Sequence, residues 1–276
     1  MPDAVSFGPP TPTDPTDLRI RPLAHSPVSS ASIHDCPCPT DPPAHILPKA
    51  AATAFWISCS YAKHVELMDV ETVVSHVAGV PHTPPDKGRL LYHTVLDHGY
   101  GNCLELGFAH GVGSAYIAAA LHELGRGQLT AVDNSSALER SPRAEQLLQP
   151  LRLNKYVHFV FHKESYTWHL MRHLEARLPP VDFCYLDGAH TWDVDGFAFF
   201  LVARILAPGG LIIFDDLDWS FASSPTLKDK PFVKEMSRER RETHQVRKVF
   251  DLLVRTDTRF DTVERDGWGF AHKVRD

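Results

Sequence analysis

The stretch Asn102-Cys-Leu-Glu-Leu-Gly-Phe-Ala-His-Gly-Val-Gly-Ser114 decides the fold of this chain. Its first five residues predict a buried β-strand, and residues 114–124 predict a helix. A glycine-rich turn lies between the two, and glycine lets the backbone turn sharply and approach a ligand closely. A strand, a glycine turn and a helix in this order are typical of the ligand-binding edge of a parallel α/β sheet.

The same alternation of strand and helix continues along the chain. The next predicted strands lie at residues 128–132, 157–161, 181–186 and 211–214. The predicted helices lie at residues 88–98, 142–153, 165–177, 193–206 and 238–254. Five apolar strands joined by helices predict a doubly wound parallel sheet of the α/β class. Segments 260–263 and 267–274 are predicted to add a C-terminal antiparallel hairpin, which gives a mostly parallel sheet of seven strands.

The N-terminal segment differs in composition from the rest. Residues 1–48 hold twelve of the 22 prolines, and proline removes a backbone donor and restricts the residue before it. We therefore expect a flexible, proline-rich extension over residues 1–48. One folded domain is expected over residues 49–276, starting with a helix at 50–68.

Composition excludes several classes of function. The 276 residues carry 28 Lys and Arg against 34 Asp and Glu, which gives a formal net charge of −6 at pH 7. A mildly acidic chain offers no cationic surface for nucleic acid or an anionic membrane, so neither partner is expected. No stretch reaches the roughly 18 to 20 apolar residues of a membrane span, and no secretion signal is seen. The five cysteines are irregularly spaced, and we expect a reducing, cytoplasmic location.

The glycine turn indicates the kind of ligand. Its glycines at positions 107, 111 and 113 do not fit the Gly-x-Gly-x-x-Gly fingerprint of pyrophosphate binding. Glu105 precedes them, and a carboxylate at this position is poorly placed beside a diphosphate. It suits a ligand with a cationic, amine-bearing tail.

A second acidic residue, Asp133, follows the predicted strand at 128–132. A carboxylate at this position of an α/β sheet accepts hydrogen bonds from both hydroxyls of a ribose. Asp133 lies 28 residues after Glu105, about one strand–helix–strand step. Together the two acids and the glycine turn predict a nucleoside ligand.

An acidic group follows the fourth and fifth predicted strands. Asp187 and His190 follow the fourth, and Asp215 and Asp216 follow the fifth. Because neighbouring parallel strands end at the same edge, the three carboxylates are expected to converge on Mg²⁺ or another divalent cation. His190, whose ordinary pKa lies near neutrality, is the predicted general base. The alternative is that Asp187 and Asp215 only cap the turns after their strands.

Four motifs, taken in order, resemble a known family. They are Leu104-Glu-Leu-Gly107 with Gly111, Val132-Asp133, Tyr185-Leu-Asp-Gly-Ala-His190, and Leu206-Ala-Pro-Gly-Gly-Leu-Ile-Ile-Phe-Asp-Asp216. This set resembles the class I S-adenosylmethionine-dependent methyltransferases, in particular the small-molecule O-methyltransferases of the catechol and macrocin type. The resemblance covers about residues 80–274. It implies a Rossmann-like sheet and makes residues 49–276 a methyltransferase domain.

The resemblance also implies roles for individual residues. The implied cofactor-binding residues are Glu105, Gly107, Ala109, Gly111, Ser114, Asp133, Glu164, Ser165, Asp187 and Thr83. Glu105 and the glycine turn would hold the methionine part, Asp133 the ribose, and the turn at Glu164 would lie near the adenine. Gly113 stands where the family often has a serine, with Ser114 one position later.

The catalytic and metal-binding residues follow from the same resemblance. The residues that match the metal ligands of the cation-dependent members are Asp187, Asp215 and Asp216. His190 falls where those enzymes place a Lys or His base. The resemblance thus implies S-adenosylmethionine and Mg²⁺ or another divalent cation as cofactors. It implies transfer of a methyl group to a hydroxyl of a small molecule, with His190 and Asp187 as catalytic residues.

Three alternatives remain open from the sequence. The first is a metal-independent or N-directed methyltransferase, in which Asp215 and Asp216 serve structure or orient an amine. The second is a nicotinamide-dependent oxidoreductase, against which the glycine spacing argues. The third is a cofactor-binding protein without turnover. Trp219 and Trp268 are predicted either to line the substrate pocket or to belong to the core, and a homo-oligomer is compatible with the sequence.

Overall fold

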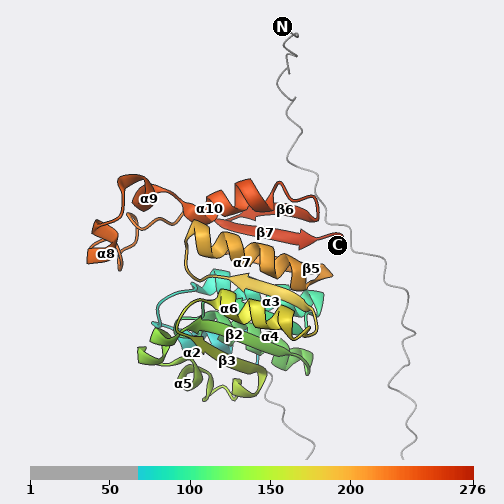
Figure 1. Cartoon of the computed structure of the whole chain (residues 1–276). Coiled ribbons are helices and arrows are strands. Elements are labelled where there is room, and N and C mark those ends of the chain that lie inside the picture. Colours follow the sequence, from blue (N-terminus) through green and yellow to red (C-terminus); the bar gives the residue numbers. More distant parts are fainter. Residues whose placement is uncertain (1–67) are drawn as a thin grey trace, which may run out of the picture. The chain divides into compact units, whose positions relative to one another are not determined.

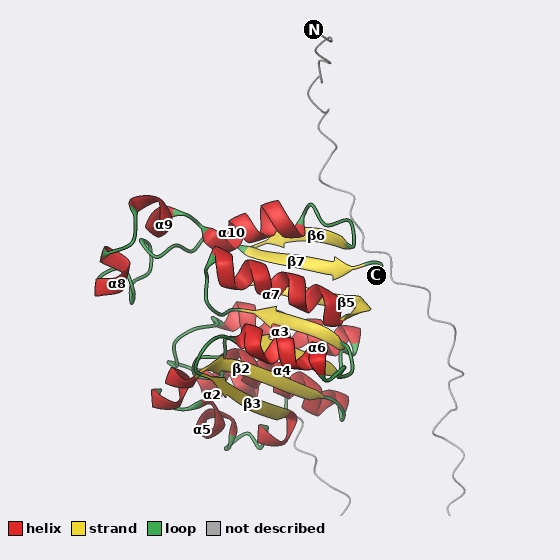
Figure 2. Ribbon diagram, viewed as in Figure 1, coloured by secondary structure: helices red, strands yellow, loops and turns green. Residues whose placement is uncertain are grey.

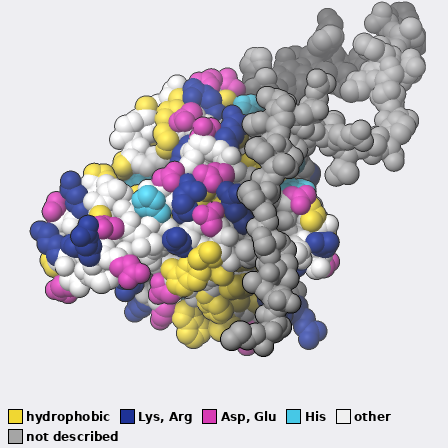
Figure 3. Space-filling model, turned by 90° about the horizontal axis from the view of Figure 1, so that it is seen from above, with side chains coloured by type: hydrophobic (Ala, Val, Ile, Leu, Met, Phe, Trp, Pro, Cys, Tyr) yellow, Lys and Arg dark blue, Asp and Glu magenta, His cyan; other side chains and the backbone are white. Residues whose placement is uncertain are grey.

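The structure is a computed structural model of the chain and describes residues 68–276 (Figure 1). The predicted extension at 1–48, the predicted domain start at residue 49 and nearly all of the predicted helix at 50–68 lie outside the described residues. Within residues 68–276, no helix is long and apolar enough to cross a membrane. Figure 3 shows Lys and Arg side chains interspersed with Asp and Glu side chains on the face that it presents.

Seven strands form one sheet, in the order β3-β2-β1-β4-β5-β7-β6. The strands are β1 (Asn102–Leu106), β2 (Gln128–Asn134), β3 (Val157–His162), β4 (Val181–Leu186), β5 (Leu206–Phe214), β6 (Phe260–Arg265) and β7 (Trp268–Lys273). The first five pair in parallel, whereas β7 pairs antiparallel with both β5 and β6. The predicted doubly wound sheet with a C-terminal antiparallel hairpin is confirmed.

Helices cover both faces of this sheet (Figure 2). The α-helices are α2 (Val70–Val77), α3 (Pro85–His98), α4 (Val112–Leu124), α5 (Ala144–Leu148), α6 (Tyr166–Glu175), α7 (Trp192–Ile205), α8 (Pro231–Lys234), α9 (Arg238–Glu242) and α10 (Gln245–Val249). The short turns are the 3₁₀ segments η1 (Ser135–Glu139) and η2 (Asn154–Tyr156) and the π-helical segment η3 (Phe250–Val254). The sequence predicts neither α2 nor α8.

Each face of the sheet has its own hydrophobic core. Successive residues of a strand point to opposite faces, so Cys103 packs with α2–α5, and Leu104 packs with α6, α7 and α10. The same alternation separates Phe183 from Cys184 on β4. Strands buried on both faces are continuous apolar runs, which explains why the sequence predicts them well.

Two predicted helices differ from the structure. The helix expected at 142–153 is only α5, because Pro150 has no N–H to donate and Arg152 has a positive φ of 56°. The helix expected at 238–254 is broken into α9, α10 and η3. At this break Gln245 donates a side-chain hydrogen bond to the carbonyl of Arg240 and accepts one from the N–H of Trp192. The side chain of Gln245 thus ties the break to α7.

The strand register brings the turns after β1, β4 and β5 to one edge of the sheet. Beyond the strand ends, the N–H of Gly107 donates to the carbonyl of Val132 at 2.8 Å. The N–H of Asp187 donates to Leu106 at 2.9 Å, and that of Asp215 donates to Leu186 at 3.0 Å. These bonds fix the turns that carry the predicted site residues.

Candidate active site

A cavity of about 870 Å³ opens at the carboxyl ends of the central strands, and we call it the main cavity. Its walls come from the loop before α3, the turns after β1, β2, β4 and β5, and residues 219–230. A smaller side cavity of about 240 Å³ shares Asp133 and Gly188 with it. Together they offer an elongated site, and cavities of about 300 to 1,000 Å³ are usual for small molecules and cofactors.

The glycine turn after β1 packs directly against the turn after β4. Gly107 has a φ of +91°, and a Cβ at this position would overlap the carbonyl oxygen of Asp187. Gly111, with a φ of +84°, begins α4, and its backbone packs against Ala144 of α5. Gly107 and Ala109 line the main cavity, whereas Gly111 does not. Gly111 therefore shapes the turn by packing.

Glu105 lies at the end of β1, only 1% exposed, at the bottom of the main cavity. Ser114 on α4 donates a short hydrogen bond to its carboxylate. Burial raises the pKa of Glu105 to about 8, although the hydrogen bond from Ser114 acts in the opposite direction. A cationic group bound here would favour the ionised carboxylate. Ser114 is fully buried and does not line the cavity, so it acts on Glu105 rather than on a ligand.

Asp133 stands where the two cavities meet. Its Oδ2 accepts hydrogen bonds from the N–H groups of Phe108 and Ala109, at 3.0 and 2.7 Å. The carboxylate therefore holds the glycine turn in place while it borders both cavities. This position is open to a diol that spans from one cavity to the other.

The side cavity contains the residues predicted near the adenine. Glu164 and Ser165 line it together with Tyr166 and Ala189. Ser165 also caps α6, since its Oγ accepts a hydrogen bond from the N–H of Thr167 at 3.2 Å. Thr83, predicted to touch the cofactor, lines the main cavity instead, beside His82. Of the predicted cofactor residues, all except Gly111 and Ser114 thus line one of the two cavities.

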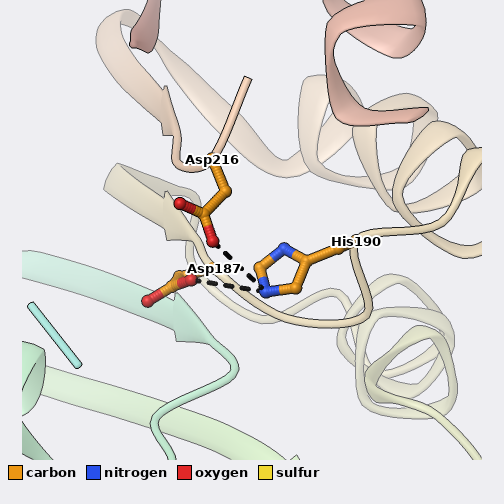
Figure 4. A group of neighbouring side chains, drawn as sticks. All are labelled: Asp187, His190 and Asp216. Atoms are coloured by element: carbon orange, nitrogen blue, oxygen red, sulfur yellow. Dashed lines mark ion pairs between the residues drawn. The ribbon is translucent and has the colours of Figure 1, made fainter. Parts of the chain in front are cut away.

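Asp187, His190 and Asp216 come together at the far end of the main cavity (Figure 4). The Nε2 of His190 lies 3.8 Å from Oδ1 of Asp187 and 3.7 Å from Oδ2 of Asp216. Trp219 also borders the group, with its ring centroid 4.9 Å from that of His190. The sequence left open whether Trp219 lines a pocket or belongs to the core, and in the structure it lines the main cavity.

Burial sets the protonation states of this group. Burial, followed by repulsion from Asp215 and Asp216, raises the pKa of Asp187 well above its usual range. Burial and repulsion from Asp215 raise the pKa of Asp216 to about 6. Burial lowers the pKa of His190, so that its imidazole is neutral at pH 7. A bound cation would offset this repulsion and favour the ionised forms of the two carboxyls.

Asp215, the third predicted metal ligand, does not join this group. Its carboxylate accepts hydrogen bonds from Lys87 at 2.7 Å and from the hydroxyl of Tyr185 at 2.5 Å. Trp268 donates a further, short hydrogen bond to it. Trp268 is 1% exposed and belongs to the core. The sequence analysis did not identify Lys87 as a partner of Asp215, because no sequence pattern links two residues that lie 128 positions apart.

Backbone strain concentrates around the main cavity. Of the residues other than glycine with positive φ, five line this cavity: His82 (77°), Thr83 (30°), Ala109 (49°), His190 (54°) and Asp216 (56°). Such conformations persist only where the surroundings enforce them, and they cluster at functional sites. The strain therefore supports this cavity as the functional site.

Comparisons with known proteins agree with this geometry. Residues 104–217 match a family model described as a methyltransferase domain. A search of curated protein sequences gives no match. Among solved structures, the chain is similar to the O-methyltransferase from Bacillus cereus in complex with S-adenosylhomocysteine. The identity is 18% and the TM-score 0.53, over 80% of this chain and 97% of that one.

Two further solved structures of methyltransferases are similar to the chain. The O-methyltransferase TomG from Streptomyces achromogenes, involved in tomaymycin synthesis and solved with S-adenosylmethionine, is 16% identical. Its TM-score is 0.54, over 83% of this chain and 100% of that one. The Podospora anserina methyltransferase PaMTH1, bound to S-adenosylhomocysteine, is 16% identical. Its TM-score is 0.53, over 84% of this chain and 99% of that one. At these identities the structures show a common fold. The common fold, together with the family model over residues 104–217, agrees with the resemblance to methyltransferases that the motifs carry.

Proposed function

We propose that this chain, whose residues 104–217 form a methyltransferase domain, transfers the methyl group of S-adenosylmethionine to a hydroxyl oxygen of a small molecule. One observation carries the proposal. A single cavity is lined both by Glu105 and Asp133 and by Asp187, His190 and Asp216. A cofactor bound to Glu105 and Asp133 would therefore share this cavity with the titratable groups of the second set.

The residues present fit S-adenosylmethionine. Glu105 at the bottom of the cavity suits the amino group, and Asp133 between the two cavities suits the ribose hydroxyls. The side cavity beside Glu164 and Ala189 suits the adenine. The bound cofactor supplies an electrophilic methyl group. The protein then orients the acceptor oxygen and removes its proton, and such positioning contributes several kcal/mol to catalysis.

In our proposal, Asp187, His190 and Asp216 remove the proton from the acceptor hydroxyl. His190 accepts the proton when no metal is bound, because its imidazole is neutral at pH 7. Asp187 and Asp216 are placed to hold a divalent cation, which when bound lowers the pKa of a coordinated hydroxyl. Because Asp215 is engaged by Lys87, it stabilises the fold of this edge in our proposal and is not a ligand.

Residues 219–230 form the wall of the main cavity on the substrate side. Trp219, Leu227 and Lys230 of this segment line it. An aromatic ring and a methylene-rich wall exclude water from the reacting oxygen, and an acceptor with two neighbouring oxygens would use the cation best. We therefore propose a catechol, a sugar diol or a hydroxy acid as the class of substrate.

A transfer assay tests this function. The protein is incubated with methyl-labelled S-adenosylmethionine and a panel of diols, catechols and hydroxy acids, with matching amines in parallel. Label in a hydroxyl product is expected, and it is lost in Asp187→Asn. Label only in amines would favour the N-directed alternative. No label in any product, despite tight binding of the cofactor, would favour a binding protein without turnover.

A further inference from the structure

We propose that Asp187, His190 and Asp216 form a site for a divalent transition-metal ion, with His190 as a nitrogen ligand and Asp215 left out. The inference deepens the proposed function and rests on it for the use of the ion in methyl transfer. Binding of the ion itself depends only on these three side chains. From the sequence, three aspartates predict a site for Mg²⁺ or another divalent cation, and this inference changes the ligand set and narrows the class of ion.

The three donor atoms face a common point. They come from two loops, after β4 and after β5, and all lie within 4.8 Å of one another. Figure 4 shows the same nitrogen of His190 directed at both carboxylates. Metal ions with bonds of about 2.1 Å hold tetrahedral ligand atoms ~3.4 Å apart. The separations of 3.7 and 3.8 Å at His190 thus need to close by only a few tenths of an ångström.

The ring of His190 packs beside the ring of Trp219 and lines the main cavity, but no hydrogen bond from the described part of the chain holds its nitrogens. Its side chain is only 18% exposed, and among residues 68–276 it makes no hydrogen bond. The two carboxylates that it faces are too distant for a hydrogen bond, whose usual limit is about 3.2 Å for nitrogen to oxygen. The nitrogens of this ring reach the surface of the main cavity, so they are open to an ion or to water. An ion between the three groups would satisfy all of them.

Asp215 is held away from this point. Lys87, Tyr185 and Trp268 come from three different elements and engage both of its carboxylate oxygens. Recruiting Asp215 as a ligand would leave Lys87, itself mostly buried, without its partner. Asp187, Asp215 and Asp216 therefore cannot together bind an ion through oxygen alone.

The donor set determines the class of ion. Mg²⁺ prefers oxygen ligands alone, whereas imidazole nitrogen suits Fe²⁺, Ni²⁺, Cu²⁺ and Zn²⁺, and Mn²⁺ suits the two carboxylates. Two carboxylates and one imidazole leave open positions for water and for substrate oxygens. In the ion-loaded protein the Nε2 of His190 is a ligand and is not available as a base.

The test uses the full chain, freed of metal with a chelator and then loaded with Mn²⁺ alone. Pulsed electron paramagnetic resonance detects nitrogen bonded directly to Mn²⁺, and calorimetry gives the affinities for Mn²⁺ and Mg²⁺. We expect a ¹⁴N coupling in the wild type and its loss in His190→Asn. This variant is also expected to weaken Mn²⁺ binding at least about tenfold. Asp216→Asn should weaken binding similarly, and Asp215→Asn by less than about threefold.

The outcomes separate this inference from the proposed function. Mn²⁺ binding without a nitrogen coupling, equal affinities in the wild type and His190→Asn, or no binding at all would overturn the site. Because the spectrum of the wild type decides the ligand set, a variant that fails to fold does not affect the test. Binding of S-adenosylhomocysteine is measured on the same sample. If S-adenosylhomocysteine did not bind to protein that shows the ¹⁴N coupling, the proposed function would be overturned and the ion site would stand.

Discussion

The buried carboxyl of Glu105 makes a quantitative prediction about stability. Its folded pKa is about 8, against an ordinary value of 4.5. Between these values the folded chain binds one proton more than the unfolded chain, so the free energy of unfolding falls as the pH rises. The slope is about 1.4 kcal/mol per pH unit well below pH 8 and about half of that at pH 8, where Glu105 is half ionised in the folded chain, so the free energy of unfolding falls by about 2 kcal/mol between pH 6 and pH 8.

The variant Glu105→Gln isolates this contribution. The amide keeps an oxygen to accept the hydrogen bond from Ser114, and it does not ionise. Asp187 and Asp216 also have raised pKa values and add to the pH dependence, but they are present in both proteins. The difference in unfolding free energy between variant and wild type should therefore grow, in favour of the variant, by about 2 kcal/mol from pH 6 to pH 8.

Urea denaturation at pH 6, 7 and 8 measures this difference. Glu164→Gln is the matched control, since Glu164 is an exposed carboxyl on the loop after β3. The control should show a difference that does not change with pH. If the difference for Glu105→Gln also did not change with pH, the carboxyl of Glu105 would ionise as readily in the folded chain as in the unfolded chain. The argument from its burial would then be wrong.

Three further predictions concern the edge of the sheet and the ion. Gly107→Ala, at φ +91° and in overlap with the backbone of Asp187, should cost at least about 2 kcal/mol in urea denaturation. Gly209→Ala, at φ +81° with nothing within 4 Å, should cost about 1 kcal/mol, and equal costs would refute the packing argument. Lys87→Met should destabilise the fold by about 3 kcal/mol because it leaves Asp215 buried without its cation, and a loss below 1 kcal/mol would contradict this. Treatment with a chelator should lower methyl transfer at least about tenfold while the affinity for S-adenosylhomocysteine stays within about twofold, and unchanged transfer would remove the metal from the account.

The fold follows from the sequence because the central strands are buried on both faces. Continuous apolar runs such as Cys103-Leu104 on β1 and Ile212-Ile213 on β5 leave few other structures possible. The helix at 238–254 was predicted as one piece, since its break depends on the side chain of Gln245, which bonds to a distant helix. A periodic pattern carries no information on such a bond.

The site was predictable as far as topology determines it. Residues after parallel strands meet at one edge, so the positions of Glu105, Asp133 and Asp187 followed from the order of the elements. The direction in which each side chain points did not follow from the order of the elements. Asp215 turns away because Lys87 and Trp268, from α3 and β7, engage it, and only the packed structure brings these residues together.

Binding of S-adenosylhomocysteine, measured by isothermal titration calorimetry on the wild type and on Asp133→Asn, tests the central claim most directly. We predict one site per chain, with an affinity at least about tenfold weaker in the variant, because Asp133 holds the glycine turn and borders both cavities. Circular dichroism confirms that the variant is folded. No binding to the wild type, or equal affinity in the two proteins, would contradict the assignment of these cavities to the cofactor.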